Sequence, residues 1–294
     1  MAGRVDIRRI GTVRCTVGEG PVWDTAEQAL YFVDLLGKTL WRYTPNDPGF
    51  TRWEMPGMIG SMALRRSGGA LVALEDGFHA VDLATGTVTP FARPDGMTAE
   101  TQFNDGKADP RGRFVAATQA RSLQEPRPLG SLYSLAPDGT VTTLDGPIHI
   151  PNGPCWSPDG ATFYFADSVK RTVFAYDYDL DTGAATNRRV FADTSALGGI
   201  PDGATVDAEG RYWVAVCLGG KIACYLPDGT LERTIDMPVR MPGSVMFGGP
   251  DLDRLYVTSL DAGNLGQTGS PDDGGLFVIE GLGATGRPEA RFAG

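Results

Sequence analysis

Six short segments of the 294-residue chain share one pattern, in which a glycine comes just before an apolar, strand-like run. The glycines are spaced 40, 46, 47, 50 and 40 residues apart, and they are Gly20, Gly60, Gly106, Gly153, Gly203 and Gly243. A repeat of about 45 residues predicts a propeller or a solenoid, because each repeat then corresponds to one structural unit.

Short β-rich runs follow turn signals in every repeat. These runs are residues 30–33, 70–74, 113–116, 162–165, 211–214 and 255–258. A third strand and a more polar fourth strand come next, for example at residues 131–135 and 140–144. Four antiparallel strands repeated six times predict an all-β, six-bladed β-propeller with a central channel. A β-sandwich or two β domains are the alternative, but no linker interrupts the repeat, and we expect one domain over residues 1–294.

The ends and the long loops of this propeller can also be predicted. The leading segment, residues 4–17, reads as an additional strand that closes the ring with the last blade, because closure removes exposed sheet edges. The longest loops, residues 120–130 and 261–274, are candidate rims or lids.

Charge and cysteine content exclude several classes of partner. The net charge of −10 and the pI near 4.7 argue against nucleic acid and anionic membranes, which both require a basic patch. The four cysteines form no CxxC pair, so we expect reduced thiols rather than a disulfide framework. With no signal peptide and no apolar run of membrane-spanning length, the chain is expected to be cytoplasmic, as a monomer or small homo-oligomer.

The residue before the repeated glycine carries the chemical signal. In a propeller, equivalent positions of successive blades converge on one axis, so this residue lies at one mouth of the channel. Four of the six residues are oxygen donors, namely Glu19, Asp105, Asn152 and Asp202, whereas the other two are Ile59 and Pro242. Such a set suits a hard divalent cation. For any single segment, Asp-Gly or Asn-Gly is better read as a turn dipeptide, and it is the alignment of four oxygen donors at one repeat position that favours a metal site.

A metal centre needs only groups that this chain has. Glu19, Asn152 and Asp202 supply two charges and three oxygens and leave positions open for water and substrate. The sequence does not choose among calcium, zinc, manganese and ferrous iron. The two histidines are His149, which could line the mouth near Asn152, and His79, which reads as structural. No nucleophile elbow or phosphate-binding glycine loop is present.

Five motifs in this order carry a family resemblance over nearly the whole chain. They are residues 18–23, 103–113, 152–154, 201–203 with 207–210, and 247–250. On these motifs the chain resembles the SMP-30/gluconolactonase/luciferin-regenerating-enzyme-like family, the regucalcin-like sugar lactonases.

The resemblance implies a six-bladed propeller with one divalent metal in its channel. The matching positions imply Glu19, Asn152 and Asp202 as metal ligands, Asn104 as a residue that binds substrate or metal-bound water, and Asp202 as general base. The implied reaction is hydrolysis of a sugar aldonolactone to the aldonic acid, with the metal polarising the lactone carbonyl and Asp202 accepting a proton from water.

Departures from the family pattern concern the substrate contacts. Gln102 stands where many sugar lactonases have Arg, and Ser122 beside Arg121 stands where they have a substrate-contacting Glu. We therefore expect Gln102, Arg121 and Ser122 to bind a lactone other than gluconolactone, such as a pentono-, deoxy- or carboxylate-bearing lactone. The sequence is equally compatible with an Arg121 side chain that points into solvent. Two alternatives remain: an aryl-ester or phosphotriester hydrolase of the same propeller type, and a non-catalytic calcium-binding propeller.

Overall fold

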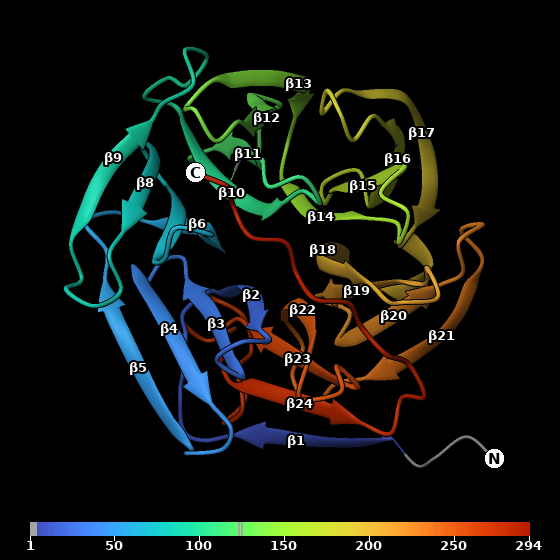
Figure 1. The fold of residues 1–294 in the computed structure, drawn as a ribbon. Coiled ribbons are helices and arrows are strands. Elements are labelled where there is room, and N and C mark those ends of the chain that lie inside the picture. The colour runs from blue at the N-terminus through green and yellow to red at the C-terminus, as the bar shows by residue number, and fades with distance from the viewer. Residues whose placement is uncertain (1–4, 123, 125) are drawn as a thin grey trace.

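The computed structural model describes residues 5–122, 124 and 126–294, which form six four-stranded antiparallel sheets around a central axis (Figure 1). The six-bladed β-propeller prediction is therefore confirmed. The first three blades are β2 (Gly18–Asp24), β3 (Ala29–Asp34), β4 (Thr39–Thr44) and β5 (Gly49–Glu54); β6 (Ile59–Leu64), β7 (Ala70–Leu74), β8 (Gly77–Val81) and β9 (Val88–Ala92); and β10 (Thr101–Ala108), β11 (Phe114–Ala120), β12 (Gly130–Leu135) and β13 (Val141–Ile148).

The other three blades continue the same order. They are β14 (Pro151–Trp156), β15 (Thr162–Asp167), β16 (Thr172–Tyr178) and β17 (Ala185–Asp193); β18 (Ile200–Val206), β19 (Tyr212–Cys217), β20 (Lys221–Tyr225) and β21 (Leu231–Asp236); and β22 (Pro242–Gly248), β23 (Arg254–Ser259), β24 (Leu276–Glu280) and β1 (Asp6–Ile10). The 3₁₀ turn η1 (Ser195–Leu197) precedes β18. The first strand of each blade lies nearest the axis, and apolar side chains between adjacent sheets form the core.

The N-terminal strand closes the ring, as the sequence predicts. β1 pairs antiparallel with β24 and forms the outer strand of the last blade. The first residue of the predicted closing segment, Arg4, lies outside the described residues. Because the first and last parts of the chain share one sheet, the ring has no open edge between its two ends.

The repeated glycines lie inside the innermost strands, not before them as the sequence analysis expects. Each innermost strand changes register against its neighbour at this point, for example between Glu19 and Val22 and between Asn152 and Cys155. Such a β-bulge bends the strand locally and redirects side chains near a functional site. The residue before glycine is thus part of a bulge at the channel mouth.

Close approach of neighbouring blades explains why these positions are glycine. A Cβ atom added at Gly60 would lie 2.2 Å from the Asn104 carbonyl oxygen of the next blade. One added at Gly203 would lie 1.9 Å from Oγ of Ser244. At Gly60 and Gly203 the narrowing of the blades toward the axis therefore leaves no room for a side chain. Gly20 has more space, and there the positive φ of 50° favours glycine.

Two equivalent turns, between β10 and β11 and between β18 and β19, are held by buried aspartates. Asp207 is fully buried and accepts hydrogen bonds from the backbone N–H groups of Glu209 and Arg211, from Nε of Arg211 at 2.7 Å and from Nε1 of Trp213 at 2.9 Å. Asp109 makes the corresponding bonds in the third blade, where it accepts from the backbone N–H and from Nη1 of Arg113. The Asp-x-x-Gly-Arg turns of the sequence therefore anchor the second strand of their blades.

Removal of the Asp207 carboxylate is expected to destabilise the fifth blade. Asp207→Ala leaves Arg211 and the turn amides without their buried acceptor, and we expect a loss of about 3–5 kcal/mol in the free energy of unfolding. Urea denaturation followed by tryptophan fluorescence measures this loss. The control is Asp228→Ala, which alters an exposed turn aspartate bound to the Thr230 amide and should cost far less. Equal losses in the two variants would contradict the anchoring role.

The C-terminal segment crosses one face of the ring (Figure 1). Its backbone bonds to the loops that follow the innermost strands, since the Phe292 amide donates to the Leu64 carbonyl and the Ala293 amide to the Gly112 carbonyl. From this segment Glu289 reaches Nζ of Lys107 at 3.6 Å. The segment therefore covers the end of the channel opposite the residues that precede the repeated glycines.

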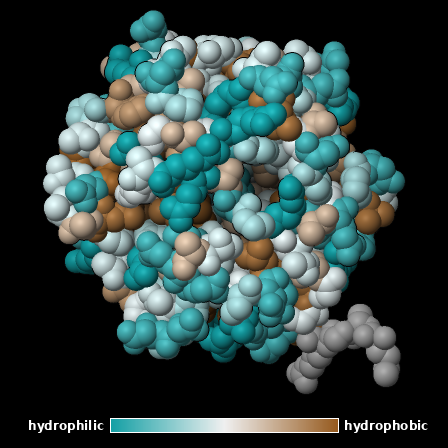
Figure 2. Space-filling model, in the orientation of Figure 1, coloured by the Kyte–Doolittle hydropathy of each residue, from teal (hydrophilic) through white to brown (hydrophobic). Residues whose placement is uncertain are grey.

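The surface on this side is mostly hydrophilic. Figure 2 shows teal and pale residues over most of the face, with apolar residues scattered singly rather than joined in one patch. Within the described residues, no helix is long and apolar enough to cross a membrane. Each of the four cysteines is buried and unpaired.

Candidate metal and active site

Three oxygen-bearing side chains from different blades meet near the channel mouth. Glu19 lies on β2, Asn152 on β14 and Asp202 on β18, with exposed fractions of 6%, 3% and 7%. The carboxyl groups of Glu19 and Asp202 are within hydrogen-bonding reach of each other. The structure thus brings together the three residues that the sequence proposes as metal ligands.

Burial makes this carboxyl pair unusually basic. The pKa of Glu19 lies well above its ordinary value, chiefly because burial penalises its charged form and further because Asp202 and Asp105 repel it. Burial, followed by repulsion from Asp105, raises the pKa of Asp202 to about 8. Two such groups can both be ionised at neutral pH only if a positive charge compensates them.

Asn152 is oriented by neighbours on both sides of its carboxamide. Its Nδ2 donates to Oγ of Ser168 at 2.9 Å, and Ser168 in turn donates to the Pro201 carbonyl at 2.6 Å. Its Oδ1 accepts a hydrogen bond from Nδ2 of Asn104 at 3.1 Å. This chain links β14 to the strand that carries Asp202 and leaves one lone pair of Oδ1 available.

Asp105 has a different role from the other oxygen donors at the repeated position. Its Oδ1 accepts the Gly106 amide at 2.7 Å and its Oδ2 accepts the Gly153 amide at 2.8 Å. Burial raises its pKa, while these amides and the Lys107 ammonium favour its charged form. Asp105 therefore ties two blades together and adds negative charge near Glu19 and Asp202.

The donor set fits a divalent cation. Among the residues that the structure describes, no cationic side chain pairs with Glu19 or Asp202, and Asn152 offers an amide oxygen fixed by hydrogen bonds. Oxygens of this kind suit hard cations. Across the described part of the chain, no three His, Cys, Asp or Glu side chains form a metal-binding group by themselves. Asn152 adds a carboxamide oxygen to the two carboxylates, so these three side chains offer oxygen donors only.

Of the proposed substrate contacts, two lie inside and two lie on the exposed rim. Asn104 is half-buried beside Asn152, and Gln102 is buried on the same strand. Arg121 is exposed, with its guanidinium bound to Oε2 of Glu75 at 2.9 Å and to the Glu75 carbonyl at 3.1 Å. Ser122 is exposed and contacts Gln124. The structure does not bring Arg121 or Ser122 to the buried carboxylates.

The two histidines pair with aspartates. Nδ1 of His149 lies 3.0 Å from Oδ2 of the buried Asp167, just before the strand that carries Asn152. His79 is buried in β8 with its Nε2 2.9 Å from Asp76. His149 thus lies at the mouth, and His79 is held within its blade.

Sequence reasoning missed several residues around the centre. Cys217 hydrogen-bonds Asp202, and burial raises its pKa well above the ordinary value, so it is a neutral thiol. Gln119 lies opposite Gln102 in the sheet, and Ser168 orients Asn152. Of these three residues, only Gln119 could have been found from the sequence. In an antiparallel pair of consecutive strands, the end of the second strand lies beside the start of the first, which places Gln119 opposite Gln102.

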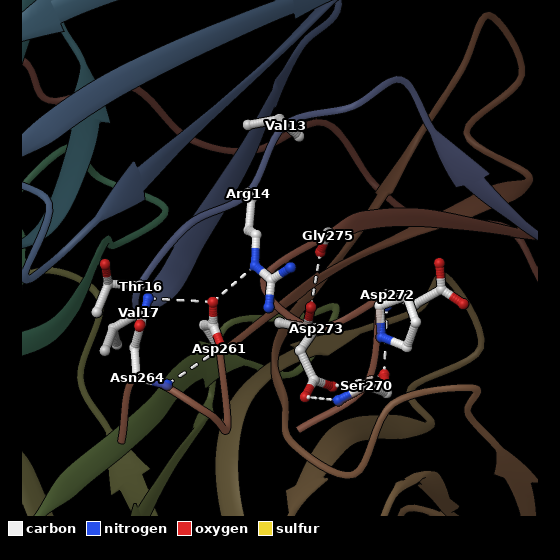
Figure 3. A network of polar contacts seen from close by, with 12 residues as sticks. Val13, Arg14, Thr16, Val17, Asp261, Asn264, Ser270, Asp272, Asp273 and Gly275 are labelled. Carbon is white, nitrogen blue, oxygen red and sulfur yellow. Dashed lines mark hydrogen bonds and ion pairs between the residues drawn. The ribbon is translucent and has the colours of Figure 1, made fainter. Parts of the chain in front are cut away.

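The described parts of both long loops lie at this mouth, and residues 123 and 125 of the first loop lie outside the described residues. The end of β11 pairs with the start of β10, so the loop that follows β11 begins at the mouth. The isolated bridge between Val17 and Leu260 places the start of the loop after β23 next to the segment that carries Glu19. Figure 3 shows how the second loop is held, with Nε of Arg14 2.6 Å from Oδ2 of Asp261 and with Asn264 bound to the same carboxylate. These loops form the rim, as their lengths predict.

Comparison with known proteins places the chain in a family. The model of the SMP-30/Gluconolactonase/LRE-like region matches residues 17–261. The chain belongs to this family. It is 39% identical to regucalcin of Xenopus laevis over 95% of both chains, and 37% identical to pentonolactonase XacC of Haloferax volcanii over 97% of both chains.

Solved structures of family members have the same architecture. A luciferin-regenerating enzyme superposes with a TM-score of 0.93 at 32% identity, covering 99% of this chain and 100% of the other. A calcium-binding protein, regucalcin, from Agrobacterium tumefaciens superposes with a TM-score of 0.88 at 31% identity, covering 97% and 96%. Relatives of comparable similarity thus have different named activities, so the site must decide which one applies here.

Proposed function

We propose that this family member is a lactonase that hydrolyses a sugar aldonolactone to the open aldonic acid. The observation that carries the proposal is the buried Glu19–Asp202 pair beside the fixed carboxamide of Asn152 at the channel mouth. The full-length similarity to a pentonolactonase supports the same substrate class.

In this proposal Glu19, Asn152 and Asp202 hold one divalent metal ion. When bound, such an ion polarises the lactone carbonyl as a Lewis acid and offsets the charge of the two carboxylates. The donor types are compatible with calcium, zinc, manganese or ferrous iron. The Agrobacterium regucalcin is a calcium-binding protein, which favours calcium as the first ion to test.

Asp202 is the proposed general base. Its carboxylate is buried beside Glu19, and a compensating positive charge would keep it ionised at neutral pH, so that it can accept a proton. It would take a proton from the water as the water oxygen bonds to the carbonyl carbon, and it would return that proton to the ring oxygen when the ring C–O bond breaks. The carboxylic acid so formed releases its own proton to solvent. Asn104, held by the Pro151 carbonyl at 2.8 Å and by Asn152, would position the substrate or the water.

Proton release on lactone opening tests the proposal. Metal-stripped protein and protein reloaded with each of the four ions are assayed with a panel of five- and six-membered aldonolactones in weak, slightly acidic buffer. The acidic pH limits spontaneous opening. We expect metal-dependent turnover of at least one lactone. If metal binds and no lactone is opened, an aryl-ester or phosphotriester substrate, or a protein that only binds its ligand, becomes the better interpretation.

A calcium-binding propeller without turnover is the second candidate. It is favoured by the calcium binding of the Agrobacterium relative and by the oxygen-only donor set. Calcium titration by calorimetry, run beside the proton-release assay, separates the candidates. Calcium binding with no lactone opening in any metal form supports this second function.

A further inference from the structure

The proposed ligand Asn152 belongs to the only Asn-Gly pair in the sequence, Asn152-Gly153. In such a pair the backbone nitrogen of glycine can attack Cγ of asparagine, because glycine has no Cβ to hinder the approach. The product is a cyclic succinimide, which water opens to aspartate or isoaspartate. Asparagine is one of the thermolabile residues for this reason. The side chain that supplies the amide oxygen of the site is therefore open to a reaction that destroys the amide.

The fold does not allow a bulkier residue at position 153. Gly153 has a φ of 61°, in the left-handed region that favours glycine. A Cβ atom added there would also lie 2.9 Å from Cβ of Ala204 and 3.0 Å from the Asp202 carbonyl oxygen, both in the next blade. Packing of the fourth blade against the fifth thus excludes the side chain that would slow an attack on Asn152.

A carboxylate in place of the amide at position 152 would also be unfavourable. Glu19, Asp105 and Asp202 already bring three carboxyl groups to this mouth, and Asp105 repels the other two. A fourth carboxylate would add to this repulsion. Both residues of the labile pair are therefore required where they are, and protection has to come from the side chains around them.

Asp105 holds the nitrogen that would attack. Its Oδ2 accepts the Gly153 N–H at 2.8 Å, across the boundary between the third and fourth blades, and its Oδ1 accepts the Gly106 N–H at 2.7 Å. Asp105 is 7% exposed, so water competes little for this amide. The attack requires loss of the amide proton, and a neighbouring carboxylate disfavours the negative charge that this loss creates. The Gly153 nitrogen is therefore fixed in place and kept protonated.

The carboxamide that would be attacked is held as well. Nδ2 of Asn152 donates to Oγ of Ser168 at 2.9 Å, and its Oδ1 accepts from Nδ2 of Asn104 at 3.1 Å. To bring Cγ onto the Gly153 nitrogen, the side chain has to turn away from these two partners. The turn breaks buried hydrogen bonds, so the reactive conformation is rarely populated.

We propose that Asn152-Gly153 is a latent deamidation site, and that Asp105 is the positioning residue that prevents the proposed ligand from cyclising. In the reaction, the Gly153 nitrogen gives up its proton and bonds to Cγ, the Cγ–Nδ2 bond breaks, and Nδ2 leaves with that proton as ammonia. Addition of one water to the succinimide gives aspartate, or isoaspartate with a methylene added to the backbone. This assigns a role to the one oxygen donor of the repeat that both holds its own strand and reaches the next blade.

Conversion would alter the metal site in one of two ways. Aspartate at position 152 would place a further carboxylate beside Glu19 and Asp202, whereas isoaspartate would lengthen the backbone of β14 and move the side chain away from Ser168. This consequence for metal binding rests on the proposed function. The reaction at Asn152 does not, because it needs only the dipeptide and the loss of its protection.

Peptide mass spectrometry after incubation at mildly alkaline pH measures deamidation at Asn152, through the mass gained when NH2 is exchanged for OH. We expect little conversion in folded wild-type protein and extensive conversion, in the same time, in urea. Asp105→Ala should raise the rate in folded protein about tenfold to a hundredfold, the effect of losing a hydrogen bond to a charged group. Ser168→Ala removes a neutral hydrogen bond and should raise it by a smaller factor, up to about tenfold.

Asp207→Ala is the control for general loosening of the fold. It is expected to destabilise the neighbouring fifth blade but leaves the bonds of Asn152 and Gly153 intact. Equal acceleration by Asp207→Ala and Asp105→Ala overturns the inference, and so does a rate in Asp105→Ala equal to that of wild type. If Asp105→Ala does not fold, Asp105→Asn decides in the same way, because it keeps the shape of the side chain and removes its charge. The Asn-Gly pair that this substitution creates lies in a different tryptic peptide from Asn152.

Calcium titration by calorimetry separates failure of this inference from failure of the proposed function. Deamidated wild-type protein should bind calcium with a changed affinity, whereas protein kept at neutral pH in the cold should not change. If no preparation binds calcium or another of the four ions, the proposed metal site is wrong, but the mass measurement still decides whether Asp105 protects Asn152.

Discussion

Asp202→Asn is expected to lower kcat for lactone opening by about a thousandfold or more, while the propeller stays folded. Asparagine keeps the shape and one oxygen donor of the side chain but cannot accept the proton of the attacking water. The expected size follows from the usual contribution of a general base, of order 10²–10⁴, together with loss of one ligand charge. Proton-release kinetics at saturating metal measure the effect.

Two further variants make this result specific. Glu19→Gln removes a ligand charge but not the proposed base, so it should mainly weaken metal affinity, and activity should return partly at high metal concentration. Asp177→Asn alters an exposed carboxylate that binds Arg189 and Asn187 on the outer part of a blade, and it should have no effect. Full activity of Asp202→Asn with metal bound would refute the base assignment.

Metal removal is expected to make stability fall as the pH rises from about 4 to about 8. In the metal-free protein the pKa of Asp202 is raised from 3.8 to about 8, and that of Glu19 also lies well above its ordinary value. The folded state then holds protons that the unfolded chain has already released. Stability from these groups is therefore complete below their unfolded pKa values and is lost as the pH rises through the folded ones.

This pH dependence of stability has the opposite sign to that of ordinary acid unfolding. Exposed aspartates such as Asp82 and Asp228 have lowered pKa values because backbone amides donate to them, so their contribution is lost only on acidification below their ordinary range. Between about pH 5 and 8 the buried pair should dominate. We expect the melting temperature of chelated protein to fall by on the order of 10 °C across this range.

Metal titration provides the control. A bound divalent cation replaces the protons, so its stabilising effect should grow with pH, and binding should release protons into weak buffer. The double variant Glu19→Gln with Asp202→Asn should show neither the fall in melting temperature nor the response to metal. A pH-independent melting temperature in chelated wild-type protein would contradict this account.

The sequence alone determined the architecture and the location of the site. The glycine repeat reports a steric requirement, since neighbouring innermost strands come too close for a side chain at Gly60 and Gly203. Turn chemistry at Asp109 and Asp207 and alternating apolar runs then specify where the strands begin. These signals are local, so they can be read without knowing how the blades pack.

The tertiary structure decided what each oxygen donor does. Glu19, Asp105 and Asp202 look equivalent in the repeat, but only Asp105 has both oxygens bonded to backbone amides, one of them from the next blade. Arg121 is adjacent to the site in sequence, yet Glu75 of another blade binds it. Contacts between blades join residues far apart in the chain, and the physical reason they escape sequence reasoning is that they depend on strand register and on the packing of adjacent blades.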